Sequence, residues 1–334
     1  MPFHERSPAR SRRRRSRVVA VAGAVMAVAV VGVPMVVLGE DSDAITPWST
    51  VTATPDDAAA DPSTDDASGS SADDAVDGTA TATPSITEAT GDSRTPTAAD
   101  AASPSGEAAP RGDLPGWSQI FVDDFDESVE QGGFPGPYSD SWLAYDGFTD
   151  TADVGTYRAS AVSAADGVLS LGVSTHGDEV TSSAVVPLVD GLWGGQTYGR
   201  YSVRLRADPV PGYSAAFLLW SDDNDWNDGE VDFPEGHLDK NVRAYNHTPG
   251  NPSENSFARR TAVPFTDWHT YTIDWTPDEI AFSIDGVTIG TTSHDIPTAK
   301  LHWVMQIETT KTTPPDGAEG AVQVDWATIY RYEG

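Results

Sequence analysis

From Leu114 onward, the chain consists of short runs in which apolar and polar residues alternate, separated by Gly, Pro, Asn and Asp. Examples are residues 167–173, 201–205, 271–275 and 280–284. Side chains alternate between the two faces of a strand, so each run predicts a half-buried strand. No long stretch shows the period and the caps of an amphipathic helix. About 220 residues of closely spaced strands predict one all-β domain, a β-sandwich.

The segment before this domain has a different composition. Residues 40–112 consist mainly of Ala, Asp, Thr, Ser and Pro, with almost no aromatic residues. Such a segment cannot bury enough apolar surface to offset the entropy lost on ordering. We therefore predict a disordered acidic linker over residues 40–112, followed by the folded domain at residues 113–334.

The N-terminus has the features of a targeting segment. Residues 1–17 contain a cluster of arginines, and residues 18–39 are apolar without a charged residue. At ~1.5 Å per residue, these residues form a helix of about 33 Å, enough to span a bilayer. That length favours a signal anchor, whereas Pro34 and the small residues near Gly39 leave a cleaved signal peptide open. Because positive residues stay in the cytoplasm, both alternatives predict an extracellular domain, secreted or anchored to the membrane.

The charge balance narrows the choice of partners. The chain has 51 acidic and 20 basic residues, a net charge of -31. A protein this acidic repels phosphate backbones, and we therefore expect no nucleic-acid partner. The same repulsion disfavours sulfated or carboxylated polysaccharides as substrates. The absence of Cys excludes a disulfide framework and a thiolate metal site.

Three carboxylates occur within six residues, at Glu230, Asp232 and Glu235. In a regular strand Glu230 and Asp232 share one face, and one extra residue in a β-bulge at Pro234 would return Glu235 to that face. Crowded carboxylates raise the proton affinity of at least one of them, as retaining glycoside hydrolysis requires. The alternative is a solvated strand edge protected by acidic residues, and the spacing alone does not separate the two.

The sequence Glu-Val-Asp-Phe-Pro-Glu at residues 230–235 resembles the Glu-x-Asp-x-x-Glu signature of glycoside hydrolase family 16, in the bulged form of its laminarinase-like members. Further segments are similar to that family, namely residues 199–207, 216–220, 268–277, 282–286 and 324–330, so the resemblance covers roughly residues 117–332. It implies a concanavalin A-like jelly-roll β-sandwich whose concave sheet forms a sugar cleft. Phe233 and Pro234 depart from the Ile or Met that laminarinases more often have there.

The resemblance also implies roles for the three acids. Glu230 would be the nucleophile, Glu235 the acid/base, and Asp232 the residue that orients the nucleophile. The implied activity is retaining endo-hydrolysis of a neutral β-glucan with β-1,3 or mixed β-1,3-1,4 linkages. The alternatives are a transglycosylase and a cell-surface lectin on the same fold. Because a lectin has no need of three clustered acids, the intact triad favours the enzyme.

Sugar-binding candidates are aromatic residues, since the apolar face of a pyranose stacks on aromatic rings. We predict substrate contacts for Trp226, Trp220, Trp193 and Tyr198, and for the polar residues His247 and Gln306. Trp275, Trp303 and Trp326 lie in strand-like runs and are expected in the core.

The predicted chemistry requires no cofactor. In some members of the family a structural calcium binds away from the cleft through an Asp of the last strand, a position that Asp325 matches. We expect a monomer whose partners are a polysaccharide substrate and, if the apolar segment is not cleaved, the membrane.

Overall fold

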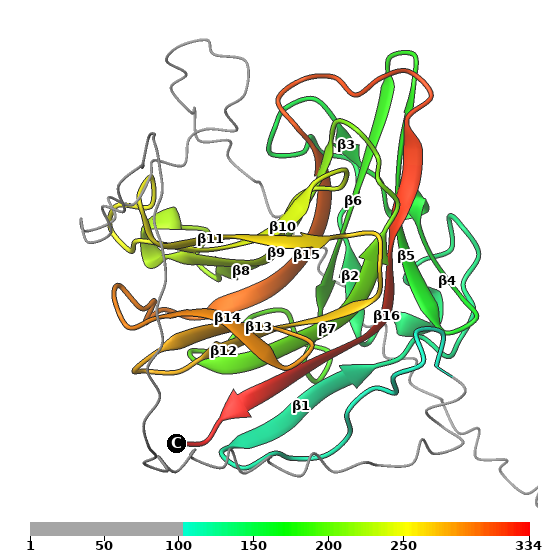
Figure 1. The fold of residues 1–334 in the computed structure, drawn as a ribbon. Helices are drawn as coiled ribbons and strands as arrows, with labels where there is room; N and C mark the ends of the chain where they lie inside the picture. The colour runs from blue at the N-terminus through cyan, green and yellow to red at the C-terminus, as the bar shows by residue number, and fades with distance from the viewer. Residues whose placement is uncertain (1–102) are drawn as a thin grey trace, which may run out of the picture. The chain divides into compact units, whose positions relative to one another are not determined.

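The computed structural model describes residues 103–334, which fold almost entirely into strands joined by turns (Figure 1). The predicted basic tail, the apolar segment and most of the linker fall in residues 1–102 and lie outside the described residues. Between residues 103 and 334, helical structure is limited to the short 3-10 helices η2 (Gly136–Tyr138), η3 (Ala159–Ala161) and η4 (Trp226–Asp228). No helix in this part has the length and hydropathy needed to cross a bilayer.

The strands form two packed layers. One layer contains β2 (Trp142–Ala144), β6 (Glu179–Pro187), β15 (Leu301–Thr309), β8 (Tyr213–Ser221), β9 (Glu230–His237), β10 (Asn241–His247) and β11 (Asn255–Pro264) in this spatial order. The other contains β5 (Val168–His176), β16 (Glu319–Tyr332), β7 (Gly199–Ala207), β12 (His269–Trp275), β13 (Ile280–Ile284) and β14 (Val287–Thr292). The remaining strands are β1 (Trp117–Asp123) beside β16, β4 (Val162–Ala165) beside β5 and β3 (Thr156–Tyr157) beside β6.

Figure 1 shows β8 to β11 lying over β12 to β14, so the strands form the predicted jelly-roll β-sandwich. Strand β6 pairs with both β15 and β5 and thereby joins the two layers. Alternation in the sequence decides which side chains enter the space between the layers. On β9, Val231 and Phe233 point inward and are buried.

Aromatic contacts hold the layers together near the three acids. Phe233 of β9 makes edge-to-face contacts with Tyr271 and Phe282 of the opposite layer, at ring-centroid distances of 5.5 and 5.6 Å. Phe257 of β11 stacks on the same Phe282 at 4.9 Å. Such pairs contribute about 0.5–1.5 kcal/mol each beyond the burial of their area. Trp275, Trp303 and Trp326 are buried, as predicted.

Two local features set the register of these strands. Asp285 and Gly286 form a two-residue turn between β13 and β14, and both have the positive φ that this tight hairpin needs (48° and 75°). In β9 the register shifts by one residue, because Glu235 lies opposite Ala216 of β8 while Asp232 lies opposite Leu218. Three steps along β9 therefore match two steps along β8, which is the predicted bulge.

The folded part begins before residue 113. The carboxylate of Asp325 on β16 accepts hydrogen bonds from the hydroxyls of Ser103 and Ser105, and the indole N–H of Trp326 donates to the carbonyl of Glu107. The Glu107 carboxylate forms a salt bridge of 2.9 Å with Arg204 of β7. Residues 103–107, which composition placed in the linker, thus pack on strands of the domain, because buried polar groups on β16 and β7 need partners.

Candidate active site

Strand β9 carries the three predicted catalytic residues on its outer face. Glu230, Asp232 and Glu235 share that face because the bulge between Asp232 and Glu235 restores the alternation that an unbroken strand would lose. Asp232 is only 2% exposed, whereas Glu230 and Glu235 are partly exposed. We call this side of strands β15, β8, β9, β10 and β11 the acid face.

The neighbouring strand β10 adds a second row of side chains to the acid face. His247 lies opposite Glu230, Tyr245 opposite Asp232, and Arg243 opposite Glu235. Their neighbours Val242 and Ala244 point the other way into the core. The alternation of β10 therefore brings one imidazole, one phenol and one guanidinium beside the three acids.

His247 is fixed by contacts at both ring nitrogens. Its Nδ1 lies 2.8 Å from the carbonyl of Pro252, and because a carbonyl only accepts, Nδ1 must carry a proton. Its Nε2 lies 3.2 Å from Oδ2 of Asp232. The ring of Trp226, from η4, covers it at a centroid distance of 5.8 Å. This arrangement directs Nε2, and a positive charge when the ring is protonated, at the acid cluster.

Burial makes the charged forms of the acids unfavourable. It raises the pKa of Glu230 to about 8, an effect strengthened by Asp232 and opposed by His247. Burial likewise raises the pKa of Asp232 to about 7. The pKa of Glu235 is raised well above its usual value, first by burial and then by Asp232 and Glu230, while Arg243 opposes this. A raised pKa is what a general acid at this position would need in order to hold its proton.

A fourth carboxyl group lies on the acid face. Glu308 of β15 accepts hydrogen bonds from the hydroxyl of Tyr157 at 3.2 Å and from the backbone N–H of Thr151 at 3.3 Å. The same Tyr157 hydroxyl lies 3.2 Å from Oε1 of Gln306. Burial, followed by Asp150, raises the pKa of Glu308 to about 8. The predicted residue Gln306 thus reaches the acid face within a polar chain.

The predicted aromatic residues separate into two groups. Trp220 lies on the acid face, where its indole N–H donates to Asn224 at 3.0 Å, and Trp193 packs on His302 at 4.6 Å while remaining 46% exposed. Together with Trp226 they lie toward the Glu230 end of the site. Tyr198, in contrast, packs edge-to-face on Trp275 at 5.3 Å. Its ring is partly buried against the core, and its backbone has a positive φ of 65°.

His302 is itself held in place by Asp222. The Nδ1 of His302 lies 3.0 Å from Oδ1 of Asp222, which also accepts from the backbone N–H of Gly195. Although burial raises the pKa of Asp222, these hydrogen bonds outweigh it and lower that pKa. An ionised Asp222 therefore anchors the imidazole under Trp193.

The surroundings of Asp325 do not fit a calcium ion. Its Oδ2 already accepts from two serine hydroxyls and from the backbone N–H of Ser105, a group that cannot ligate a cation. The guanidinium of Arg204 donates to the same Ser105 hydroxyl and brings positive charge to the site. Calcium takes six to eight oxygen ligands, which this arrangement does not offer.

Elsewhere in residues 103–334, one set of side chains could hold a metal ion. Ligand atoms of Glu230, Asp232 and His247 all lie within 4.8 Å of one another. Two carboxylates and one imidazole suit a divalent transition metal. These same atoms are the ones that the predicted hydrolysis uses, and that chemistry requires no metal.

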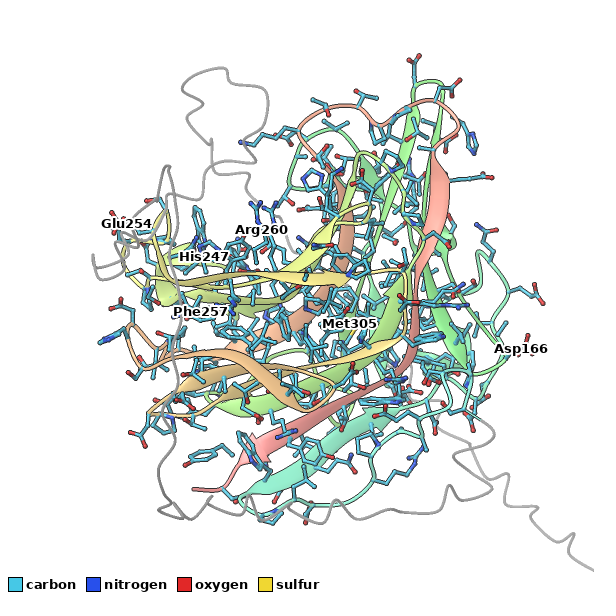
Figure 2. All side chains as sticks on the ribbon, in the orientation of Figure 1. Asp166, His247, Glu254, Phe257, Arg260 and Met305 are labelled. Atoms are coloured by element: carbon cyan, nitrogen blue, oxygen red, sulfur yellow. The ribbon has the colours of Figure 1, made fainter. Side chains whose placement is uncertain are left out.

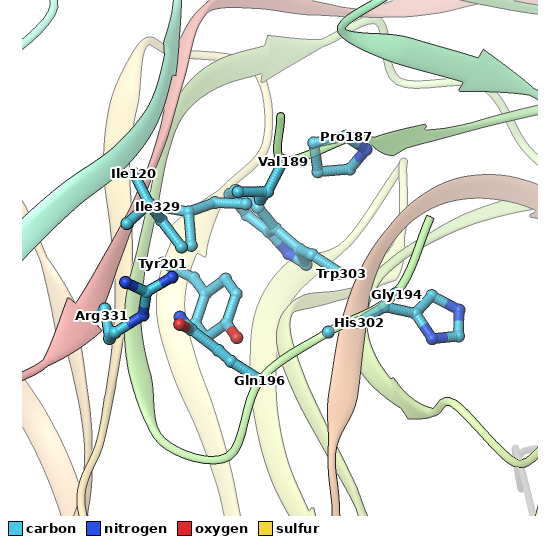
Figure 3. A pocket seen from close by; sticks show the side chains of 11 residues that line it. Ile120, Pro187, Val189, Gly194, Gln196, Tyr201, His302, Trp303, Ile329 and Arg331 are labelled. Atoms are coloured by element: carbon cyan, nitrogen blue, oxygen red, sulfur yellow. The ribbon is translucent and has the colours of Figure 1, made fainter. Parts of the chain in front are cut away.

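The described part also contains a small pocket away from the acids. It has a volume of about 80 Å³ and lies between β1, β7, β15 and β16, with Tyr201, Gln196 and Arg331 on its wall (Figure 3). None of the three acids lines it. The pocket is therefore not the catalytic centre.

Several residues of the acid face were not predicted as site residues. Arg243 and Tyr245 alternate with buried residues along β10, so the period-two pattern in residues 241–247 contained the signal that places them beside His247. Tyr157 had no such signal, because it reaches Glu308 through the pairing of β3 with β6.

The comparisons with known proteins point to one family. The family model described as "Glycosyl hydrolases family 16" matches residues 193–328. A beta-glucanase from Rhodothermus marinus is 30% identical over 194 residues, covering 51% of this chain and 64% of that protein. Crh-like protein 2 from Aspergillus fumigatus is 34% identical over 95 residues, 27% of this chain and 20% of that protein. The chain therefore spans less than two thirds of these relatives.

Solved structures share the fold at lower sequence identity. A laminarinase from Flavobacterium sp. UMI-01 superposes with a TM-score of 0.53 and 17% identity, covering 64% of this chain and 100% of that one. The beta-glucanase of Bacillus licheniformis gives a TM-score of 0.51 and 19% identity, with 63% and 96% covered.

Proposed function

We propose that this chain, whose residues 193–328 match the model of glycosyl hydrolases family 16, is a retaining endo-glycosidase acting on a β-glucan. The observation that carries the proposal is the convergence of Glu230, Asp232 and Glu235 on one face, with His247 against Asp232. A solvated protective edge would leave such acids exposed and separate, whereas Asp232 is buried.

The reaction would proceed by two displacements. Ionised Glu230 attacks the anomeric carbon while protonated Glu235 gives its proton to the leaving oxygen, and a covalent glycosyl-enzyme forms. Glu235, now a carboxylate, takes a proton from the water that attacks the anomeric carbon and releases Glu230. His247 and the indole N–H of Trp226 favour the charged form of Glu230, since both lower its pKa.

The similarity to a beta-glucanase supports a β-glucan as the substrate. Tyr145 and Trp220 are partly exposed and pack on a buried apolar cluster beside the acids, so their rings suit the apolar faces of glucose rings. We propose β-1,3 or mixed β-1,3-1,4 linkages, on the basis of the bulged signature at residues 230–235.

We also propose that the domain acts outside the cell, secreted or anchored, and as a monomer. The support is the arginine cluster followed by the apolar residues 18–39. Detection of the full chain in washed membranes, in the medium or in the cytosol of the producing cells distinguishes these locations.

The decisive experiment compares the full chain with its Glu230→Gln variant on laminarin, lichenan, agarose and xyloglucan. We expect new reducing ends from a β-glucan, first as the β-anomer in proton NMR, and none from the variant. Equal activity of the variant would overturn the assignment of Glu230. Binding without cleavage would favour a lectin, and transfer to added oligosaccharides in preference to water would favour a transglycosylase.

A further inference from the structure

We propose that Arg243 and Arg260 form a subsite that binds an anionic substituent, a carboxylate or a sulfate, on the polysaccharide cleaved at the neighbouring Glu235. The inference rests on the proposed function and specifies its substrate further. It also revises the expectation from net charge that anionic polysaccharides are disfavoured, because the charge beside the acids differs from that of the whole chain.

The register of three strands places the two guanidinium groups in line with Glu235. Arg243 of β10 pairs with Glu235 of β9 on one side and with Arg260 of β11 on the other. Paired residues of antiparallel strands share a face, so all three side chains project from the acid face. Figure 2 shows Arg260 on the outer side of β11 and Phe257 between the layers. Arg260 is exposed and Arg243 partly exposed, so an anion on a bound chain can reach both.

Placing two arginines opposite each other has an electrostatic cost. Like charges at directly opposed positions of an antiparallel pair destabilise the sheet. Neither Arg243 nor Arg260 forms a salt bridge within residues 103–334, although Arg111, Arg200 and Arg204 each do. Arg243 donates a hydrogen bond to the Tyr245 hydroxyl at 3.4 Å. An anion between the two guanidinium groups would offset their repulsion.

The chemistry of the pair selects an oxyanion. A guanidinium presents its N–H donors in a planar fork that matches carboxylate and sulfate oxygens. In a chain with a net charge of -31, free anions and polyanions are repelled at long range. An anionic group binds to such a protein only where nearby cations attract it and where the sugar chain that carries it makes further contacts. A substituent on a polysaccharide already lying across the acid face meets both conditions.

Arg259 distinguishes this proposal from a protective role of charge on an edge strand. Strand β11 is the edge of its layer, and charged residues on edges prevent association with other strands. Arg259 precedes Arg260 on the same edge but pairs with Ala244, whose side chain points into the core layer, so Arg259 does not share the acid face. If the charges only protected the edge strand, Arg259 and Arg260 would serve that purpose equally.

The test measures binding to one β-glucan in three forms, unsubstituted, carboxymethylated and sulfated, at matched chain length. The full chain carries Glu230→Gln to prevent cleavage, and Arg260→Ala or Arg259→Ala is added to it. Titration calorimetry in 20 and 200 mM salt gives the ratio of affinities for the charged and neutral forms, and thermal melting verifies folding. Hydrolysis of each of the three forms by the chain with Glu230 intact is assayed separately.

We expect tighter binding of at least one charged form at low salt, and about a tenfold drop in the affinity ratio with Arg260→Ala. Arg259→Ala should keep the ratio. The two charged forms show whether the subsite takes carboxylate, sulfate or both. Equal binding of all three forms by the chain that carries only Glu230→Gln would overturn the subsite. Equal effects of Arg260→Ala and Arg259→Ala on the affinity ratio would also overturn it. Absence of hydrolysis of any form would instead count against the glycosidase itself.

Discussion

The Nε2 atom of His247 lies 3.2 Å from Oδ2 of Asp232, and its Nδ1 atom is fixed by the carbonyl of Pro252. The carboxylate of Asp232 and the carbonyl of Pro252 thus hold the ring at its two nitrogens. Asp232 lies on β9, His247 on β10 and Pro252 in the turn after β10. The histidine and its contacts therefore come from the strand pair that carries the acids. From this position His247 lowers the pKa of Glu230.

Replacing His247 by Ala should change the pH dependence of hydrolysis. His247 lowers the pKa of Glu230, so its loss should raise that pKa further. The acidic limb of the kcat profile should move to higher pH by roughly one unit. Initial rates between pH 4 and pH 9 measure it, with the exposed His176→Ala as control. An unchanged limb together with a lower rate would mean that His247 only supports the fold.

Replacing Trp193 by Ala should weaken substrate binding more than it slows the chemistry. Its ring is 46% exposed beside His302 and lies away from Glu235, so it suits stacking on a sugar that does not react. We expect KM to rise about three- to tenfold with kcat changed less than twofold, since the stacking is the same in the ground and transition states. Steady-state kinetics on the preferred glucan provides the measurement. Trp117→Ala, which removes a ring packed on Tyr332, is the matched control and should leave KM unchanged.

Replacing Glu308 by Gln should stabilise the protein above neutral pH. Burial raises the pKa of Glu308 to about 8, whereas in the unfolded chain its pKa is near the ordinary 4.5. Between these values the folded state binds a proton that the unfolded state releases, so wild-type stability falls as pH rises. Glu308→Gln removes the titrating group, so the stability of the variant does not fall with pH for this reason. Its advantage in urea unfolding should therefore be small at pH 5 and larger at pH 8. A constant difference at the two pH values, matching that of the exposed Glu319→Gln, would contradict the prediction.

Removing residues 103–112 should destabilise the domain. Without them Asp325 and Arg204 lose hydrogen-bond partners and the indole N–H of Trp326 loses its acceptor. Unpaired buried polar groups cost roughly 1–3 kcal/mol each, so a chain that starts at residue 113 should melt well below one that starts at residue 103. The variant Ser105→Ala in the longer chain should fall between them. Identical melting of the two chains would show that the contacts of residues 103–107 contribute no stability.

The sequence determined the class of fold and the shared face of the three acids, because both follow from the alternation of side chains along single strands. It also placed Glu235 on the face of Glu230 through a bulge at Pro234, since the bulge follows from residues adjacent along the chain. The burial of Trp275, Trp303 and Trp326 followed from the same pattern.

The tertiary structure decided what lies around the acids, because those contacts join segments far apart in the chain. Tyr157 reaches Glu308 across 151 residues, and Ser103 reaches Asp325 across 222. Tyr198 is a sugar-binding candidate in the sequence, and in the fold its ring packs on Trp275. Arg243 and Arg260 become neighbours only when β10 and β11 pair in one register. Periodicity assigns a side chain to a face, but only strand pairing and layer packing decide which other side chains it meets there.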